Sequence, residues 1–308
     1  MDPLHVVTCV ANPVRWRSRI ALYRDFEQHM LDSGVKLTVV ECAYGERPWE
    51  LPDNPHVNLV RVRCSGHNMV WNKESLLRIG IERAPDAKYV AAIDADVQFR
   101  SASWAADTVH ALQHFFVVQP WTYCYDLGPN GEHIASHKSF AALWQQRKPI
   151  VQGPNAVSGY EFGHPGYAWA YTRQALEWMS GFIETAALGA ADHHMAMALI
   201  NKVQDSIHGG MTKAYKDALY LWQSRAYQHI RGEVGALRGT IEHMWHGDKG
   251  KRAYVSRWDI LAKHEFDPVT DLKRNSYGVV ELAGNKPELS RDIHAYFASR
   301  DEDSTTMG

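Results

Sequence analysis

The sequence predicts an α/β fold in which helices flank a mainly parallel sheet, and three observations lead to this class. Strand and helix patterns alternate along the first hundred residues, which is typical of parallel sheets with crossover helices. The composition, with 45% hydrophobic and 22% charged residues, is that of a globular chain that can bury a core. A length of 308 residues suits one large domain or two closely packed halves.

Each predicted element follows from its local pattern. The apolar, β-branched run LHVVTCV (residues 4–10) predicts a first strand, which a short loop at residues 11–13 ends. The next stretch, through residue 31, has apolar side chains at helical spacing. The remaining elements of this half are two strands, a helix ended by Pro85 and a fourth strand: VKLTVVECA (35–43), VNLVRVRC (57–64), WNKESLLRIGIERAP (71–85) and KYVAAIDADV (88–97).

Two carboxylates stand near the end of the fourth predicted strand, in YVAAIDADVQF (89–99). A single aspartate there would serve as an ordinary turn residue. Strand alternation places Asp94 and Asp96 on the same side of the chain, where their repulsion would raise the pKa of one of them unless a cation lies between. Ligands of open α/β sheets bind outside the carboxyl ends of strands. The pair therefore predicts a Mg²⁺ or Mn²⁺ site that faces substrate phosphates.

Several classes of protein are disfavoured by what the sequence lacks. It has neither GxxxxGK[ST] nor GxGxxG after the first strand, which disfavours a P-loop kinase and a Rossmann dehydrogenase. Its four cysteines form no CxxC pair, which favours a reducing compartment. The start of the chain lacks a signal-peptide pattern, and no run of about 18 apolar residues occurs. We expect a soluble cytoplasmic protein without a membrane span.

The charge distribution is uneven. Residues 211–264 hold ten Lys/Arg against five Asp/Glu, interleaved with aromatic residues, whereas residues 265–308 hold five against nine. The basic stretch suits the phosphates of a nucleotide or of nucleic acid. The alternative is a solvated helix face with its aromatic side chains in the core.

Four later stretches carry side chains suited to a binding site. The first predicts a loop against a ligand, the second places Asp192 at a predicted helix N-cap, the third sets two histidines beside a basic cluster, and the fourth ends in acids. They are FGHPGYAWAYTRQAL (162–176), GAADHHMAMALI (189–200), HMWHGDKGKRAYVSRWDIL (243–261) and HAYFASRDED (294–303).

The ordered set WNKE, IDADVQF, HPGYAWAYTR, GAADHHMAMAL and HMWHGDKGKRAYVSR resembles the nucleotide-sugar-dependent glycosyltransferases of the GT-A fold. Within that fold it is similar to a group found in bacteriophages and large viruses. The likeness spans nearly the whole chain. It implies a nucleotide-sugar-binding half at residues 1–100, an acceptor-binding and metal-histidine half of the same domain at 101–264, and a helical C-terminal extension at 265–308.

The resemblance also implies site residues. Asp96 is similar to the direct ligand of a Mn²⁺ or Mg²⁺ ion, and Asp94 to the residue that contacts the donor ribose or a metal-bound water. His246 is the implied third ligand, and His243 is its alternative. The donor, most simply a UDP-sugar, would contact Ala11, Asn12, Pro13, Arg17, Glu41, Asn72, Lys73, Asp94, Ala95, Lys249 and Arg252. The acceptor would contact Trp121, His164, Gly166, Trp169, His193 and His194.

Asp192 matches the position of the family's catalytic base, which takes the proton of the acceptor hydroxyl. A plain N-cap is the competing interpretation, and both roles are compatible, although a helix dipole lowers the basicity of a capping carboxylate. Many inverting members carry Glu-Asp here, whereas this chain has Ala191 before Asp192. Inversion and retention of the anomeric configuration therefore both stay open.

The leading acceptor is 5-hydroxymethylcytosine, or another hydroxymethylpyrimidine, in phage DNA, and a polysaccharide or lipopolysaccharide is the alternative. From another class, a zinc hydrolase would draw its ligands from Asp94, Asp96, His193, His194, His243 and His246, although HExxH is absent. A non-catalytic nucleic-acid-binding module leaves the paired aspartates unexplained. The donor sugar and the oligomeric state do not follow from the sequence.

Overall fold

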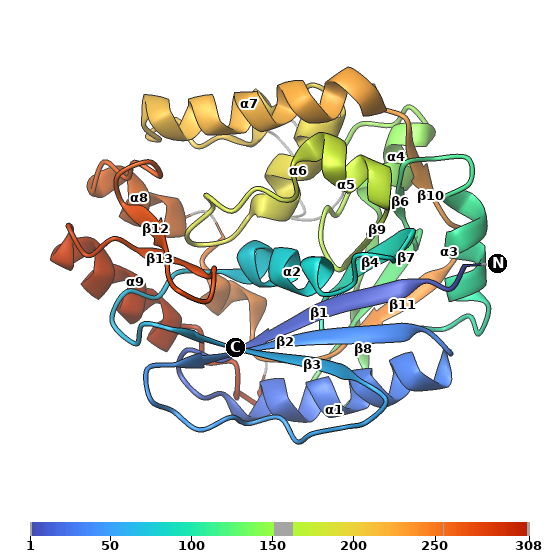
Figure 1. The fold of residues 1–308 in the computed structure, drawn as a ribbon, viewed down its shortest axis with the longest axis horizontal. Helices are drawn as coiled ribbons and strands as arrows, with labels where there is room; N and C mark the ends of the chain where they lie inside the picture. Colours follow the sequence, from blue (N-terminus) through green and yellow to red (C-terminus); the bar gives the residue numbers. More distant parts are fainter. Residues whose placement is uncertain (1, 151–162, 255, 307–308) are drawn as a thin grey trace.

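Strands and helices alternate along the first hundred residues, as the sequence predicts (Figure 1). The structure, a computed structural model, describes residues 2–150, 163–254 and 256–306. The strands are β1 His5–Ala11, β2 Lys36–Tyr44, β3 Asn58–Cys64, β4 Tyr89–Ile93, β5 Val97–Phe99, β6 Val117–Gln119, β7 Tyr123–Leu127, β8 His133–Lys138, β9 Ala168–Thr172, β10 Val234–Ala236, β11 Thr240–His243, β12 Leu272–Arg274 and β13 Val280–Leu282. The helices are α1 Arg17–Asp32, α2 Lys73–Glu82, α3 Trp104–Ala111, α4 Phe140–Gln145, α5 Arg173–Met179, α6 Ala191–Leu199, α7 Lys213–Ile230, α8 Arg257–Lys263 and α9 Pro287–Ser299, with short 3₁₀ helices η1 Val203–Ser206 and η2 Lys249–Arg252.

The central sheet has seven strands in the order β10-β6-β9-β4-β1-β2-β3. Its neighbouring strands are parallel except at β9, which pairs antiparallel with both β4 and β6. Helices lie on both faces of this sheet (Figure 1). The predicted class, α/β with a mainly parallel central sheet flanked by helices, is confirmed.

Alternate residues of β1 feed two apolar cores on opposite faces of the sheet. Val6 belongs to the core that contains Phe26 of α1, and Val7 belongs to the core that contains Leu76 of α2. This separation follows from the period of two in a strand. Helix α2 approaches closely because Gly80 has no side chain, and a Cβ there would lie 2.5 Å from Cγ1 of Val7.

A second sheet, in the order β5-β11-β7-β8, joins distant parts of the chain beside the first. Strands β5 and β11 are antiparallel, with Val97 opposite His243. The N–H of Met244 donates to the carbonyl of Asp96 at 2.9 Å. Backbone pairing therefore holds the turn after β4 next to the residues that follow β11.

Three details differ from the predicted elements. The fourth strand ends at Ile93 rather than running to Val97, so Asp94 and Asp96 lie in a turn between β4 and β5. The N–H of Asp94 donates to the carbonyl of Tyr167 at 2.8 Å, one pair beyond the last pair of β4 and β9, Ile93 with Ala168. Strand alternation therefore does not set the directions of the two carboxylates. The predicted loop at 162–176 contains β9 and the start of α5, while Phe162 lies outside the described residues.

The C-terminal region is not purely helical, because β12 and β13 form a two-stranded sheet before α9. It is anchored to the first half of the chain: the N–H of Leu282 donates to the carbonyl of Asn68 at 2.8 Å, and the N–H of Val280 donates to Oγ of Ser75 at 3.0 Å. Within the described residues, none of the helices is both long and apolar enough to cross a membrane.

Candidate functional site

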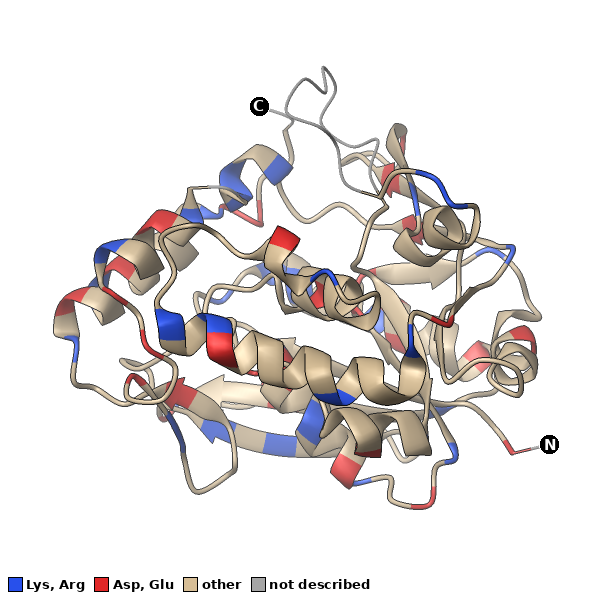
Figure 2. Cartoon of the chain, turned by 90° about the horizontal axis from the view of Figure 1, so that it is seen from above, with Lys and Arg blue, Asp and Glu red and all other residues tan. Residues whose placement is uncertain are grey.

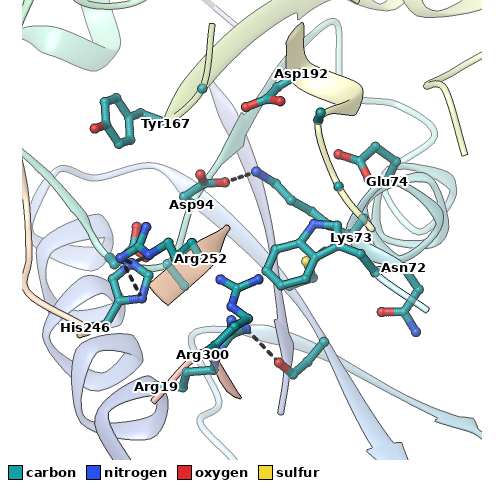
Figure 3. Close-up of a pocket in the computed structure, with 18 of the residues that line it drawn as sticks. Arg19, Asn72, Lys73, Glu74, Asp94, Tyr167, Asp192, His246, Arg252 and Arg300 are labelled. Atoms are coloured by element: carbon teal, nitrogen blue, oxygen red, sulfur yellow. Dashed lines mark hydrogen bonds and ion pairs between the residues drawn. The ribbon is translucent and has the colours of Figure 1, made fainter. Parts of the chain in front are cut away.

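A cavity of about 340 Å³ lies beside the turn after β4 (Figure 3). Its lining comes from the end of β1, the start of α2, the 94–96 turn, the loop before β9, the start of α6, the residues after β11, the start of α8 and the end of α9. The predicted site residues that the structure brings together there are Ala11, Pro13, Asn72, Lys73, Asp94, Ala95, Asp96, His164, Gly166, Asp192, His193, His243, His246, Lys249 and Arg252.

Asp96, His243 and His246 form a cluster whose ligand atoms all lie within 4.8 Å of one another. Oδ2 of Asp96 is 3.0 Å from Nε2 of His246 and 3.9 Å from Nε2 of His243. The two Nε2 atoms are 3.2 Å apart, and Oδ1 of Asp96 is buried without a hydrogen-bond partner. One carboxylate and two imidazoles aimed at one point are a donor set for a divalent transition metal. Both histidines from the predicted alternatives belong to this cluster.

Asp126 of β7 holds His243 in position. It is buried, and its Oδ1 lies 2.9 Å from Nδ1 of His243 and accepts from the hydroxyl of Tyr167 at 3.0 Å. Its Oδ2 contacts Nε2 of His137 and accepts from Nζ of Lys249 at 2.5 Å. Burial raises the pKa of Asp126, but the hydrogen bonds from His137 and His243 outweigh it and leave that pKa below its ordinary value.

This contact determines the tautomer of His243. Because ionised Asp126 only accepts, Nδ1 of His243 carries the proton and Nε2 keeps its lone pair toward the cluster. Burial lowers the pKa of His243 to about 4, so the ring is neutral near pH 7. The sequence reasoning missed Asp126, although an aspartate near the end of the apolar strand YCYDL is the same kind of signal as Asp94.

Arginines surround a buried carboxylate on the same side of the cavity. Glu302 accepts from Nε of Arg19 at 2.7 Å and pairs with Nη2 of Arg300 at 2.7 Å. Nη2 of Arg252 lies 3.1 Å from Nε2 of His246, whose Nδ1 is 3.5 Å from Glu302. Figure 3 shows Arg252 beside His246, with Arg19 and Arg300 lower in the view. The sequence reasoning missed Arg19, Arg300 and Glu302, although it singled out the acidic end of residues 294–303.

Asp94 faces away from the metal cluster and forms an ion pair with Lys73 (Figure 3). Burial lowers the pKa of Lys73, but the negative charges of Asp94, Glu74 and Asp192 together raise that pKa above its ordinary value. Burial likewise raises the pKa of Asp94, even against the attraction of Lys73. The two predicted carboxylates therefore have different partners: Asp96 contacts the histidines, and Asp94 forms an ion pair with Lys73.

Glu74, the next residue of α2, is a buried acid that lines the cavity and was not predicted. Burial raises the pKa of Glu74 to about 8, against the positive charge of Lys73 and with the negative charge of Asp192. Glu74 and Asp192 both lie on the side of the cavity opposite Arg19 and Arg300 (Figure 3).

Asp192 lies in the first turn of α6 and is not its N-cap. The helix begins at Ala191 because Gly189 and Ala190 both have positive φ, 91° and 72°, which turns the chain just before it. Oδ1 of Asp192 accepts from the N–H of His193 at 2.8 Å. The N-cap prediction for Asp192 is wrong, because Ala190, two residues earlier, is the N-cap, but Asp192 still lines the cavity.

Three predicted acceptor residues are in the core instead. Trp121 is fully buried and donates from Nε1 to the carbonyl of Ala168, and Trp169 is buried and donates to the carbonyl of Pro165. His194 lies between the hydroxyls of Ser206 and Tyr215, at 2.8 and 2.9 Å. None of these three side chains lines the cavity, and their polar atoms have hydrogen-bond partners within the fold.

Three residues predicted to contact the donor do not line the cavity and instead stabilise nearby loops. Asn12 bonds to both the N–H and the carbonyl of Trp16 and so closes the loop before α1. Arg17 is exposed, and its N–H donates to Asp303. Glu41 is buried and accepts from the N–H of Leu51, which fixes the loop after β2.

The basic stretch at 211–264 only partly resembles a binding surface. Of its aromatic residues, Tyr215, Trp222 and Trp258 are buried, whereas Tyr220 and Tyr254 are exposed. Figure 2 shows basic and acidic residues interspersed along the helices. The core interpretation therefore holds for the buried three, and Tyr254 stands at the cavity.

No known protein family matches the chain in sequence, and neither does any curated protein. Among solved structures, it is similar to the catalytic domain of Drosophila β1,4-galactosyltransferase 7 in complex with xylobiose (15% identity, TM-score 0.33, covering 63% of this chain and 59% of that one). It is also similar to S. aureus TarS residues 1–349 in complex with UDP-GlcNAc (10%, 0.42, 79% and 58%). A third is a putative nucleotide-diphospho-sugar transferase from Desulfovibrio desulfuricans (12%, 0.34, 87% and 99%).

The chain thus spans about three fifths of the length of the first two structures. The first and third of these proteins are transferases by name, and the second is in complex with UDP-GlcNAc. Because the TM-scores lie below 0.5, no residue role is transferred from these proteins to this chain.

Proposed function

We propose that the chain is a metal-dependent glycosyltransferase that moves a sugar from a nucleoside diphosphate sugar, most simply a UDP-sugar, to an acceptor hydroxyl. One observation carries this proposal: the cluster of Asp96, His243 and His246 shares a cavity with the guanidinium groups of Arg19 and Arg252. A divalent cation site flanked by arginines matches the charge of a diphosphate.

The metal-binding residues fit Mn²⁺ or Mg²⁺, and they fit Mn²⁺ better because imidazole is a poor ligand for Mg²⁺. The buried, unpartnered Oδ1 of Asp96 supports this assignment, since a buried carboxylate oxygen is costly without a partner. When bound, the cation supplies positive charge to the leaving diphosphate. Asp96, His243 and His246 would hold it, and Asp126 would keep Nε2 of His243 pointed inward.

The remaining cations of the cavity, Arg252, Lys73 and Lys249, have different roles. Arg252, close to His246, is placed to donate to diphosphate oxygens as negative charge develops there. Lys73 holds Asp94 at the turn, and Asp94 in turn is placed to accept from a donor hydroxyl. Lys249 already bonds to Asp126 and Tyr167, so its first role is to support the metal side.

On the opposite side, Asp192 would accept the proton of the attacking hydroxyl. It lines the cavity at the start of α6, and a Cβ on Gly166 would lie 2.9 Å from its Oδ2. The absence of a side chain at Gly166 therefore lets this carboxylate lie close to the loop before β9. His193, also in the lining, is placed to orient the acceptor.

For the acceptor, we propose a hydroxymethylpyrimidine in DNA, with 5-hydroxymethylcytosine first and a polysaccharide as the alternative. Exposed Tyr254 at the cavity supports a flat, aromatic or sugar-like ligand. The test is sugar transfer to hydroxymethylcytosine-containing duplex and to unmodified duplex. Transfer to a saccharide with none to either duplex would remove the DNA proposal.

A zinc hydrolase is the second candidate function, because two histidines and one aspartate also suit Zn²⁺. Its six proposed ligands do not gather: Asp94 pairs with Lys73, and His194 is enclosed by Ser206 and Tyr215. Only three of the six, Asp96, His243 and His246, lie together. The arginines beside them would have no role in such a hydrolase.

Thermal unfolding with UDP-glucose, with and without Mn²⁺, tests the transferase. We expect Tm to rise only when UDP-glucose and Mn²⁺ are both present, because a ligand that binds only the folded state stabilises that state. Addition of Mn²⁺ to the Asp96→Asn variant should not raise Tm. The control is Asp86→Asn, an exposed acid before β4, which should keep the full shift. A shift with Zn²⁺ alone and none from the nucleotide sugar would favour the hydrolase.

A further inference from the structure

Arg257, the first residue of α8, is a buried cation whose guanidinium has no hydrogen-bond or ion-pair partner among the described residues. It is 8% exposed and lines the cavity. Its Nε is buried and unpartnered, and among the described residues no carboxylate lies within 4.0 Å of its guanidinium. The ring of Tyr254 lies 5.2 Å from its Cζ. A buried charge in this state is costly unless a ligand supplies the counter-charge.

The other arginines of the cavity differ from it. Arg19 and Arg300 share Glu302, and Arg252 lies against His246. Arg252 therefore contacts the metal cluster directly, and Arg19 and Arg300 are linked to it through Glu302, which lies 3.5 Å from Nδ1 of His246. Arg257 has no such contact, so its counter-charge must come from another part of the ligands.

Its position is beside the start of α6. A Cβ on Gly189 would lie 3.2 Å from Nη1 of Arg257, so the guanidinium occupies the space that this glycine leaves. Helix α6 has nine residues, and its N-terminus adds positive dipole charge there. The acids that face this region are Asp192 and Glu74, and Asp192 points to Gly166 rather than to Gly189.

We infer that Arg257 and the N-terminus of α6 bind an oxyanion, a phosphate or a carboxylate, that the acceptor carries next to its reactive hydroxyl. The inference rests on the proposed function, because it identifies the Asp192 side of the cavity as the acceptor side. It defines the acceptor as an anionic molecule, such as a phosphodiester chain or an acidic saccharide. A guanidinium binds either group through two parallel hydrogen bonds.

The test fills the donor site first. Protein saturated with UDP and Mn²⁺ is titrated by calorimetry with methyl phosphate and, in a separate arm, with acetate. The variants are Arg257→Gln, Arg257→Lys and, as a matched control on the same helix, Lys263→Gln, whose side chain is exposed. Melting curves of all variants establish that they are folded.

Wild type and Lys263→Gln should bind one of the two anions with the same affinity. Arg257→Gln should weaken that binding by at least about tenfold, and Arg257→Lys by less, because it keeps the charge and loses the paired geometry. The preferred anion identifies the group as phosphate or carboxylate.

Two results would overturn the inference: no saturable binding of either anion, or equal binding in Arg257→Gln. Binding of the anions only when UDP is absent would also overturn it, since the anion would then occupy the donor diphosphate position. If UDP with Mn²⁺ fails to bind in the first step, the proposed function fails instead, so the two failures are distinguishable.

Discussion

On the metal side of the cavity, protein groups partner one another: Asp126 alone accepts from His243, Tyr167 and Lys249 and contacts His137. On the acceptor side, no carboxylate among the described residues pairs with Arg257, and burial raises the pKa of Glu74 to about 8. The first side is organised by the fold before any ligand arrives. The second side has charges that a ligand must partner.

The two sides also come from different elements. The metal side is built on β5, β7 and β11, whose register fixes His243 opposite Val97 and Asp126. The acceptor side is built from the first turns of α2, α6 and α8, where Glu74, Asp192 and Arg257 stand. Strand pairing positions side chains within one sheet, whereas helix starts bring free N–H groups and charges from separate elements.

The largest expected effect comes from disrupting the metal side through Asp126→Asn. We expect the Mn²⁺ dissociation constant to rise by about 10- to 100-fold, because a metal-binding histidine loses its charged orienting partner. Loss of the charge that partners Lys249 should also lower the free energy of unfolding by about 1–3 kcal/mol.

The measurement is Mn²⁺ titration followed by electron paramagnetic resonance, alongside urea unfolding. Asp107→Asn, an exposed acid on α3, is the control and should change neither quantity. If Asp126→Asn loses stability but binds Mn²⁺ as tightly as wild type, Asp126 serves only the fold.

The second prediction concerns Glu74 on the acceptor side. The pKa of Glu74 in the folded protein, about 8, lies above its ordinary value of 4.5. Between these two pH values the folded protein keeps a proton on Glu74 that the unfolded chain releases. Stability from this group is therefore fully present below about pH 4.5 and falls as pH rises to about 8, by at most about 1.4 kcal/mol per pH unit. Above that range the loss is complete.

Urea unfolding from pH 5 to 8.5 checks this slope. Glu74→Gln should lose stability less steeply with pH than wild type, since the amide does not ionise. Glu82→Gln, an exposed acid on the same helix, should follow the wild-type slope. Parallel curves for Glu74→Gln and wild type would show that Glu74 is ionised in the folded protein.

The smallest effect on function is expected for Trp121→Phe, behind the cavity. Trp121 is fully buried and donates to the carbonyl of Ala168. The substitution should lower the free energy of unfolding by about 1–3 kcal/mol and leave the acceptor KM within about twofold. Urea unfolding and steady-state kinetics measure the two quantities. A large rise in KM at unchanged stability would return Trp121 to the acceptor wall.

Much of the cavity lining was predictable where a local pattern coincided with chemistry. Asp94 and Asp96 were found because acids are rare at the end of an apolar run, and His243 and His246 because they stand beside a basic cluster. Arg19 was missed in favour of Arg17, because the helix begins at residue 17 and its phase turns Arg17 outward. That phase depends on Asn12 closing the loop around Trp16, which no spacing rule gives.

The sequence by itself determined the strand and helix order of the first half and the α/β class, because both depend on the local alternation of apolar and polar side chains. Only the tertiary structure decided which partner each charge meets. Asp94 meets Lys73, Asp96 meets His246 and Arg257 meets no described carboxylate, because these contacts join elements up to about 150 residues apart through strand register and helix phase.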